Sequence, residues 1–166
     1  MGIGRINGKE IIIKFPPNGL GRVEFKADVQ TGDGLSLGEV RFKLDSGSDF
    51  TTINREDLES LGYTQEFLKT CPFHHSDVLA ASDDVKMRLQ YITNISIKFG
   101  YRELKGCRIF FNLGKNLRSL FGSDILKYFN YEINYDKSEF RLNKTKIPPI
   151  LSESETLIQI YTVERE

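Results

Sequence analysis

The chain has 166 residues, 23 basic and 23 acidic side chains, and a formal net charge of zero. A chain of this length can bury its own hydrophobic core, so we expect a single domain over residues 1–166. Because a neutral chain lacks the basic field that holds a phosphate backbone, nucleic acid is not an expected partner.

The two cysteines, Cys71 and Cys107, are too few for a disulfide framework. No run of residues is long and apolar enough for the hydrophobic part of a signal sequence or for a membrane span. The sequence therefore predicts a soluble protein of a reducing compartment, and we expect a cytoplasmic location without membrane contact.

The first predicted elements are three strands, at residues 10–15, 23–29 and 37–44. Each alternates apolar and polar side chains, which is the pattern of a strand with one buried face. Turn residues separate the strands, as in "PPNGLG" and "QTGDG". The third strand runs directly into Asp45, within the stretch "RFKLDSGSDFTTI".

Two short helices and a long strand follow. Asn54 can cap "REDLESL", with Gly62 as a left-handed stop, and Thr64 can cap "QEFLK". Residues 85–99 carry apolar or aromatic side chains at most odd positions. This alternation predicts a long, half-buried strand with a bend midway.

The rest of the chain is predicted to hold short strands and one more helix. The strands are residues 108–112, 131–135, 138–142 and 156–163, and Gly122 and Ser123 open the helix "DILKYF". So many short strands between turn residues predict an all-β barrel or sandwich.

The acidic residue at the end of the third strand, Asp45, has two interpretations. Taken alone, "DSG" is typical of a tight turn in which the Asp side chain binds backbone amides. Here, however, the preceding strand carries the carboxylate into apolar surroundings, and an extended run resumes at once. A second feature lies further along the chain, where Leu120 and Phe121 run into Gly122 ahead of a predicted helix.

In these two motifs the chain resembles the retropepsins, the single-domain aspartic proteases of retroviruses, retroelements and some cellular and bacterial proteins. The family carries Asp, Thr or Ser, Gly, Ala or Ser, then commonly Asp, a variable residue and Thr, and residues 45–51 match at each position. Its second hallmark, two apolar residues and Gly before a short helix, matches residues 120–122. The resemblance covers about residues 20–143, flanked by N-terminal and C-terminal strands. It implies a closed all-β barrel with a ψ-loop and one or two short helices, acting as a homodimer.

The resemblance also implies an aspartic endopeptidase, in which an activated water lies between two carboxylates. Asp45 would supply half of this pair, Ser46 would bond across the two-fold axis, and Gly47 would let backbone approach the water and substrate. The other candidate acid, Asp33 in "QTGDG", is better interpreted as part of a hairpin turn. Two-lobed pepsins carry both motifs on a longer chain, so the second carboxylate here must come from a second copy.

A groove for a protein or peptide substrate is implied beside this pair, with no metal and no cofactor. Its lining residues would be Ser48, Asp49, Ala81, Ser82, Leu120, Phe121 and Gly122. Ala81 and Ser82 belong to the flap candidate "VLAASDDVKM", which lacks the glycines usual in the family. Ser123 stands where retroviral members have an Arg that braces the dimer. Dimerisation must therefore rest on other contacts, for which the segment "TLIQIYTV" is the best candidate.

Other chemical interpretations of the sequence are weaker. Cys71, His74, His75 and Cys107 could be written as a zinc set, but their spacing matches no standard finger, and a surface loop with two histidines is preferred. The aromatic residues could stack on nucleic-acid bases, but without accompanying basic charge they are better explained as core packing.

Two other functions stay open. The missing flap glycines favour a non-catalytic dimer of the same fold, whose groove holds a peptide that is never cut and which acts as a binding or assembly module. The third possibility is a β-barrel ligand carrier, in which "DSGSD" is only a turn.

Overall fold

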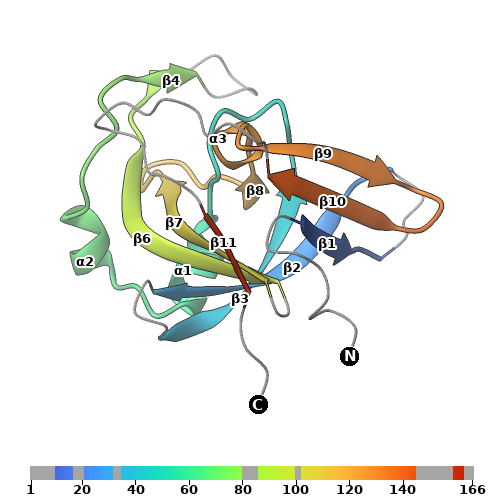
Figure 1. Ribbon diagram of the computed structural model, residues 1–166. Coiled ribbons are helices and arrows are strands. Elements are labelled where there is room, and N and C mark those ends of the chain that lie inside the picture. Colours follow the sequence, from blue (N-terminus) through green and yellow to red (C-terminus); the bar gives the residue numbers. More distant parts are fainter. Residues whose placement is uncertain are drawn as a thin grey trace.

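The computed structural model describes residues 10–16, 21–31, 35–79, 86–99, 102–144 and 159–162. Strands dominate, and the described short helices stand between strands in chain order (Figure 1). The strands are β1 (Glu10–Lys14), β2 (Glu24–Thr31), β3 (Ser36–Leu44), β4 (Val78–Leu79), β5 (Lys86–Met87), β6 (Gln90–Phe99), β7 (Arg102–Phe111), β8 (Leu120–Phe121), β9 (Phe129–Asn134), β10 (Glu139–Lys144) and β11 (Gln159–Thr162). The helices are α1 (Arg55–Ser60), α2 (Gln65–Lys69) and α3 (Ser123–Leu126), so the described residues form three short helices where the resemblance implied one or two.

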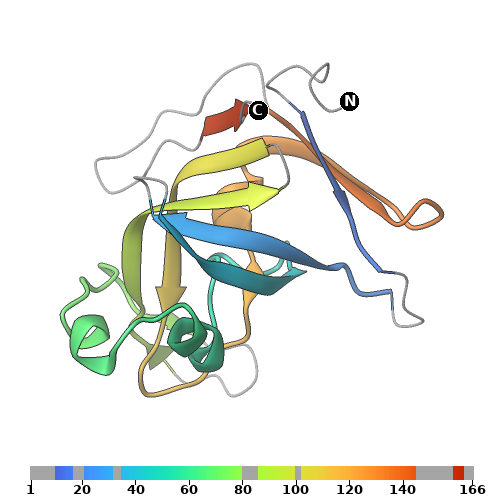
Figure 2. The ribbon, with the colours of Figure 1, turned by 90° about the horizontal axis from the view of Figure 1, so that it is seen from below.

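A curled six-stranded sheet forms the body of the molecule, in the order β11-β7-β6-β2-β3-β8 (Figures 1 and 2). Neighbouring strands are antiparallel except β3 and β8, which run parallel, with Leu44 opposite Phe121. Thr52 bridges Phe110 of β7 and Leu120 of β8, and so joins the two sides of the sheet. The predicted all-β barrel is thereby confirmed.

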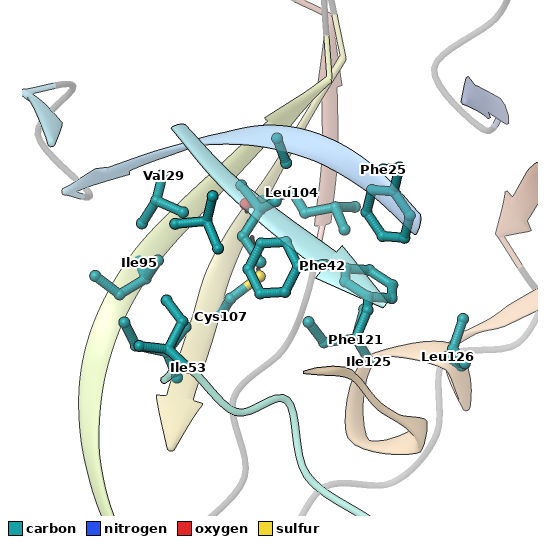
Figure 3. Close-up of a cluster of buried hydrophobic side chains, with 14 of the residues drawn as sticks. Phe25, Val29, Phe42, Ile53, Ile95, Leu104, Cys107, Phe121, Ile125 and Leu126 are labelled. Atoms are coloured by element: carbon teal, nitrogen blue, oxygen red, sulfur yellow. Dashed lines mark hydrogen bonds between the residues drawn. The ribbon is translucent and has the colours of Figure 1, made fainter. Parts of the chain in front are cut away.

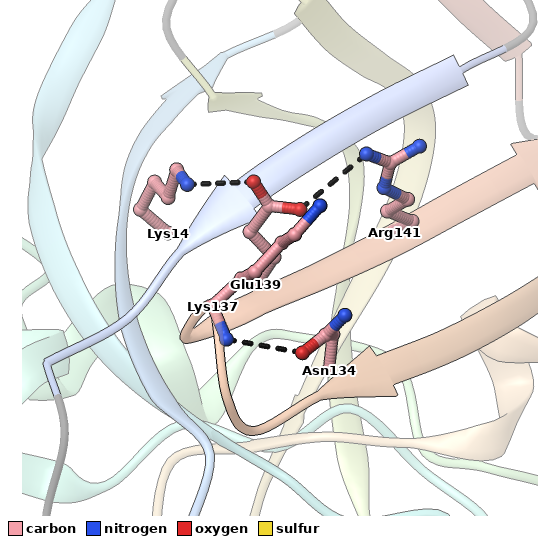
Figure 4. A network of polar contacts seen from close by, with 5 residues as sticks. All are labelled: Lys14, Asn134, Lys137, Glu139 and Arg141. Atoms are coloured by element: carbon pink, nitrogen blue, oxygen red, sulfur yellow. Dashed lines mark hydrogen bonds and ion pairs between the residues drawn. The ribbon is translucent and has the colours of Figure 1, made fainter.

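A smaller three-stranded sheet, in the order β1-β10-β9, projects from the barrel (Figures 1 and 2). Glu139 of β10 lies in this sheet with a side chain only 11% exposed. Its Oε1 accepts a hydrogen bond from Lys14 Nζ at 2.6 Å, and its Oε2 lies 3.4 Å from Arg141 Nη2 (Figure 4). The hydrogen bond from Lys14 holds the pKa of the Glu139 carboxyl below its usual range, against the opposing effect of burial.

The core fills the inside of the barrel with aliphatic and phenylalanine side chains (Figure 3). Phe25 packs against the rings of Phe42, Phe99, Phe121 and Phe140, with centroids 5.4–6.1 Å away. Aromatic pairs at these separations stabilise a core beyond the area that they bury. The second residue of the apolar-apolar-Gly motif is therefore part of the core.

The two predicted helix caps are confirmed. Asn54 Oδ1 accepts a hydrogen bond from Asp57 N at 2.7 Å, and Thr64 Oγ1 accepts one from Phe67 N at 3.2 Å. Such side-chain oxygens satisfy backbone donors that have no partner in the first turn of a helix. Gly62 follows α1 with a φ of 94°, the left-handed conformation expected of a helix stop.

The predicted long strand over residues 85–99 is instead two strands, β5 and β6, and its alternation changes phase. Asn94 has a φ of 57°, and the pairing of β6 with β7 shifts register between Ile92 and Ile95. Within β6, the buried side chains before this bulge are Gln90 and Ile92, whereas after it they include Ile95. A bulge adds one residue to one strand, so side chains on its two sides follow different faces. Tyr91 is thereby directed away from the core.

The C-terminal strand completes the edge of the chain's own barrel sheet. Gln159 lies opposite Lys105 of β7, and Thr162 lies opposite Arg102. One edge of the segment "TLIQIYTV" is therefore already paired within this chain. Among the described helices, none has the length and apolar character needed to cross a membrane.

Candidate active site

Asp45 follows β3 directly and begins a tight loop over residues 45–50. Its backbone N–H donates to Phe121 O at 3.0 Å, which ties the end of β3 to β8. Its Oδ1 accepts a hydrogen bond from Gly47 N at 3.0 Å, and Ser48 N donates to Asp45 O at 3.1 Å. The carboxylate is half-buried, while Ser46 and Gly47 are exposed. The loop thus presents one oriented acid at the surface of the barrel.

The loop is held from behind by Thr51 and Asp124. Thr51 Oγ1 donates to Asp124 Oδ1 at 2.7 Å, and Thr51 N donates to Asp124 Oδ2 at 3.0 Å. The same hydroxyl accepts a hydrogen bond from Gly122 N at 3.1 Å. Burial raises the pKa of the Asp124 carboxyl, and the hydrogen bonds from Thr51 act in the opposite direction. Two segments distant in sequence, at Thr51 and at residues 122–124, are therefore held together by one carboxylate and one hydroxyl.

Gly122 lets the chain after β8 pass directly beneath the loop. A Cβ atom at this position would lie 2.5 Å from Phe50 O and 2.9 Å from Ser48 O. Backbone atoms cannot move aside as a flexible side chain can, so only glycine fits. Ser123 N then donates to Ser48 O at 2.8 Å. We call this contact of residues 45–51 with Gly122, Ser123 and Asp124 the loop crossing.

The loop crossing includes a ψ-shaped arrangement of backbone. β8 lies between β3 on one side and the segment at Thr52 on the other, with Thr52 N donating to Leu120 O at 2.9 Å and Leu120 N donating to Thr52 O at 3.0 Å. Ile53 N donates to Phe110 O at 3.0 Å, which attaches the same segment to β7. The predicted ψ-loop is thereby confirmed.

The structure brings most of the predicted site residues to this one place. Asp45, Ser46, Gly47, Ser48 and Asp49 form the loop, and Leu120, Phe121 and Gly122 run beneath it. The side chain of Leu120 is half-buried, whereas that of Phe121 is fully buried in the core. The ring of Phe121 consequently faces the barrel interior.

The predicted flap is described only at its base. Val78 pairs with Met87 and Leu79 with Lys86, so β4 and β5 form the stem of a hairpin. Ala81 and Ser82, the two flap residues expected to face substrate, lie outside the described residues.

Sequence reasoning missed Asp124 as a structural partner of the loop. The signal was present, because Thr51 is the last residue of the first motif and Asp124 follows the glycine of the second. Their pairing became visible only when the two motifs were seen in contact.

The four residues weighed as a zinc set, Cys71, His74, His75 and Cys107, do not come together in one cluster. Cys107 is fully buried in the barrel, where burial raises the pKa of its thiol, and Cys71 lies after α2 with its Sγ 3.6 Å from Phe67 O. His74 and His75 pack against each other, with ring centroids 4.3 Å apart. No group of three or more His, Cys, Asp or Glu side chains in the described ranges is arranged to hold a metal ion.

No protein-family model and no curated protein sequence matches the chain. Among solved structures, the chain is similar to a retropepsin-like aspartic protease from Rickettsia conorii, with a TM-score of 0.52 and 25% sequence identity. The similarity covers 81% of this chain and 90% of that chain. With the barrel and the ψ-loop described above, it shows that the chain has a retropepsin-like fold.

Proposed function

We propose that the chain is a homodimeric aspartic endopeptidase, which cleaves protein or peptide substrates with a water held between two Asp45 carboxylates. The observation that carries the proposal is the loop crossing. It holds Asp45 at a strand end on a loop that Gly122 and the Thr51–Asp124 pair keep in one conformation. The likeness to a retropepsin-like aspartic protease supports the same interpretation.

The chemistry requires two carboxyl groups in different protonation states. One ionised Asp45 removes a proton from the water, whose oxygen attacks the carbonyl carbon of the scissile peptide bond. The other, protonated Asp45 hydrogen-bonds to the carbonyl oxygen and stabilises the negative charge that develops there. A proton is then delivered to the leaving nitrogen as the C–N bond breaks, which returns the pair to its starting state. Two carboxyls at close range can share one proton because like charges there do not ionise together easily.

A second copy is needed because one chain offers one acid at this place. Within the described residues, the hydrogen bond that reaches the Asp45 carboxylate comes from Gly47 N, and none joins it to another carboxyl group. Ser46 and Gly47 are exposed and so are open to contact from outside. An isologous dimer would bring two copies of the same loop together across its two-fold axis.

We propose the three-stranded sheet as a second candidate for the dimer contact, beside "TLIQIYTV". Among the described strands, β9 has a neighbour on one side only, namely β10, just as β11 has only β7. β9 begins just after α3, the helix that carries Asp124, and its side chains at Asn130, Tyr131 and Glu132 are exposed. Unpaired strand edges of this kind readily accept a strand from another chain.

The cytoplasmic location is kept as part of the proposal. Both cysteines, Cys71 and Cys107, are free thiols in the fold. Free, buried thiols are compatible with a reducing compartment, where disulfides do not persist.

The direct test compares wild type with Asp45→Asn on a peptide library at mildly acidic pH. Asp136→Asn is the matched control, because Asp136 lies in the exposed turn between β9 and β10. We expect cleavage by wild type and by Asp136→Asn and its loss in Asp45→Asn, with all three proteins equally stable. Equal cleavage by wild type and Asp45→Asn would overturn the proposal.

The second candidate function is a non-catalytic peptide-binding or assembly module with the same fold. It is favoured by the flap candidate "VLAASDDVKM", in which no glycine eases the approach of substrate backbone. A pepstatin-type transition-state analogue discriminates the two functions. Binding of an extended peptide without binding of the analogue would favour the module.

A further inference from the structure

A second aromatic cluster lies on the face of β7 that points away from the core. Cys107, Ile109 and Phe111 of β7 belong to the core, and Arg108 and Phe110 alternate with them onto the opposite face. We call the group formed by Phe50, His74, Tyr91, Arg108 and Phe110 the outer cluster.

The rings of the outer cluster are in mutual contact. The Phe110 centroid is 4.8 Å from that of Phe50, 5.6 Å from that of Tyr91 and 5.9 Å from that of His74. Tyr91 takes part because the bulge at Asn94 changes the phase of β6 and turns its ring outward. The cluster thus joins three separate segments, on β6, on β7 and in the loop after α2, to the catalytic loop.

Phe50 is the link between the outer cluster and the loop crossing. Its ring lies 4.9 Å from that of His74, while its carbonyl oxygen is the atom that a Cβ at residue 122 would strike. Anything that binds the outer cluster therefore contacts the same short loop that carries Asp45.

Arg108 gives the outer cluster a positive charge that no carboxylate of the described residues neutralises. Its guanidinium carbon lies 4.6 Å from the centroid of the Tyr91 ring. Its Nε is buried without a hydrogen-bond partner, and no carboxylate of the described residues forms an ion pair with it. Burial, then the neighbouring His75 and then Arg108 lower the pKa of His74. The contact of this guanidinium among the described residues is the Tyr91 ring, and such a cation–π contact leaves it without a hydrogen-bond acceptor.

We propose that the outer cluster is a specificity site, which binds an acidic side chain of the extended peptide that lies in the groove beside Asp45. The proposal rests on the proposed function, because it names the substrate that the same groove would take. A guanidinium presents donors in a planar fork that matches a carboxylate, and the aromatic rings around it exclude water and strengthen that pair. A Glu or Asp side chain supplies the opposite charge and acceptors for the terminal guanidinium nitrogens, which, unlike Nε, are not buried.

The two-fold axis of the proposed dimer adds a sharper expectation. Each copy carries one outer cluster, so a peptide that crosses the axis passes two of them, one on each side of the scissile bond. The acidic preference should consequently appear at two positions of the substrate, placed about symmetrically around the cleaved bond. A single basic site elsewhere on the surface would give no such symmetry.

The first experiment maps cleavage sites in a peptide library and then compares one good substrate with its Glu→Gln counterparts. We expect kcat/KM to fall about tenfold when an acid at either preferred position is neutralised, the size of effect typical of a hydrogen bond to a charged group. The preference should weaken in high salt, which screens charges that are partly exposed. This comparison uses the wild-type protein and so does not depend on the folding of any variant.

The second experiment assigns the preference to Arg108. Arg108→Gln should lose the discrimination between Glu and Gln peptides while still cleaving the Gln peptide, and Arg108→Lys should keep part of it. Arg41→Gln removes the same charge from an exposed position of β3 and should retain the full preference. Thermal unfolding of each variant checks that it is folded.

Peptide binding to the Asp45→Asn protein, followed by fluorescence anisotropy, separates this inference from the proposed function. Cleavage without acidic preference would overturn the specificity site and leave the protease proposal standing. If the wild-type protein cleaves no peptide, and the Glu peptide still binds more tightly in a way that depends on Arg108, the result would support the site and reject the protease. Equal binding of Glu and Gln peptides would overturn the site in either case.

Discussion

The loop crossing and the outer cluster share the same short loop, but they differ in whether their buried polar groups have hydrogen-bond partners. In the loop crossing, both oxygens of Asp124 accept hydrogen bonds from Thr51, whose hydroxyl is itself the acceptor for Gly122 N. In the outer cluster, Arg108 Nε is buried without a partner. The contacts among Thr51, Asp124 and Gly122, whose polar groups are matched from within, hold the shape of the loop, whereas the unmatched guanidinium of Arg108 is suited to receive a ligand.

The strongest way to break the loop crossing is Gly122→Ala. The new Cβ would overlap Phe50 O, a backbone atom, so either the loop or β8 must move. We expect a loss of at least about 3 kcal/mol in the free energy of unfolding, the upper end of the usual cost of overpacking, and loss of any cleavage. Gly114→Ala is the control, since the nearest atom there is the side-chain oxygen of Asn112 at 3.3 Å. Urea unfolding in which both variants match wild type would contradict the tight crossing.

A smaller change, Thr51→Val, removes one hydroxyl and keeps the shape of the side chain. It leaves Gly122 N without its acceptor and removes one of the two hydrogen bonds to Asp124 Oδ1, which keeps the one from Ile125 N; an unsatisfied buried group costs about 1–3 kcal/mol. We expect the unfolding free energy to fall by about 2 kcal/mol, with a larger proportional loss of activity because the loop loses its anchor. Thr70→Val, at an exposed helix end, should change stability by less than about 0.5 kcal/mol. Equal stability of the two variants would remove the anchoring role.

Arg141 is the contrast to Arg108, because it contacts a carboxylate of the same chain. That carboxylate belongs to Glu139, which Lys14 also contacts. Since the pKa of this carboxyl is lower in the folded chain than in the unfolded one, its contribution to stability is present above the unfolded pKa. That contribution is lost as the pH falls through the folded pKa. The thermal unfolding temperature of wild type should therefore be higher than that of Glu139→Gln near neutral pH, and this difference should shrink in acid. A difference that grows in acid would contradict the assigned sign.

Arg108→Gln tests the other side of the comparison and should have the smallest effect on stability. Because Arg108 has no ion pair among the described residues, its replacement removes the contact with the Tyr91 ring and relieves a buried donor. We expect an unfolding free energy within about 1 kcal/mol of wild type, a smaller change than that of Thr51→Val. A loss of several kcal/mol would mean that Arg108 is part of the internal structure rather than an open binding group.

The parts that sequence predicts well are those where local backbone geometry dictates the residue. Asp45 and Gly47 suit the turn after β3, where Gly47 N donates to Asp45 Oδ1, and Gly122 is required by a crossing that leaves no room for a Cβ. Asn54, Thr64 and Gly62 are required by the ends of short helices. Each of these positions allows few residue types, so the sequence carries a clear signal.

The parts that sequence could not predict depend on contacts between distant segments. The phase change in β6 follows from a bulge at Asn94 that forms against β7, so plain alternation placed Tyr91 on the core side when it faces outward. Phe121 was expected to line the groove, but its ring packs against Phe25 and Phe42 in the barrel. The predicted strand at residues 108–112 begins earlier, at Arg102, because pairing with β6 and β11 compensates for its charged start.

The central claim is that two Asp45 side chains, one from each copy, form one active site. The most direct test mixes wild type with Asp45→Asn at constant total concentration after subunit exchange. If both acids are required, activity follows the square of the wild-type fraction, so an equal mixture retains about one quarter of the wild-type activity. Activity that falls in direct proportion to the wild-type fraction, to about one half in the same mixture, would show that each copy acts alone and would contradict the account.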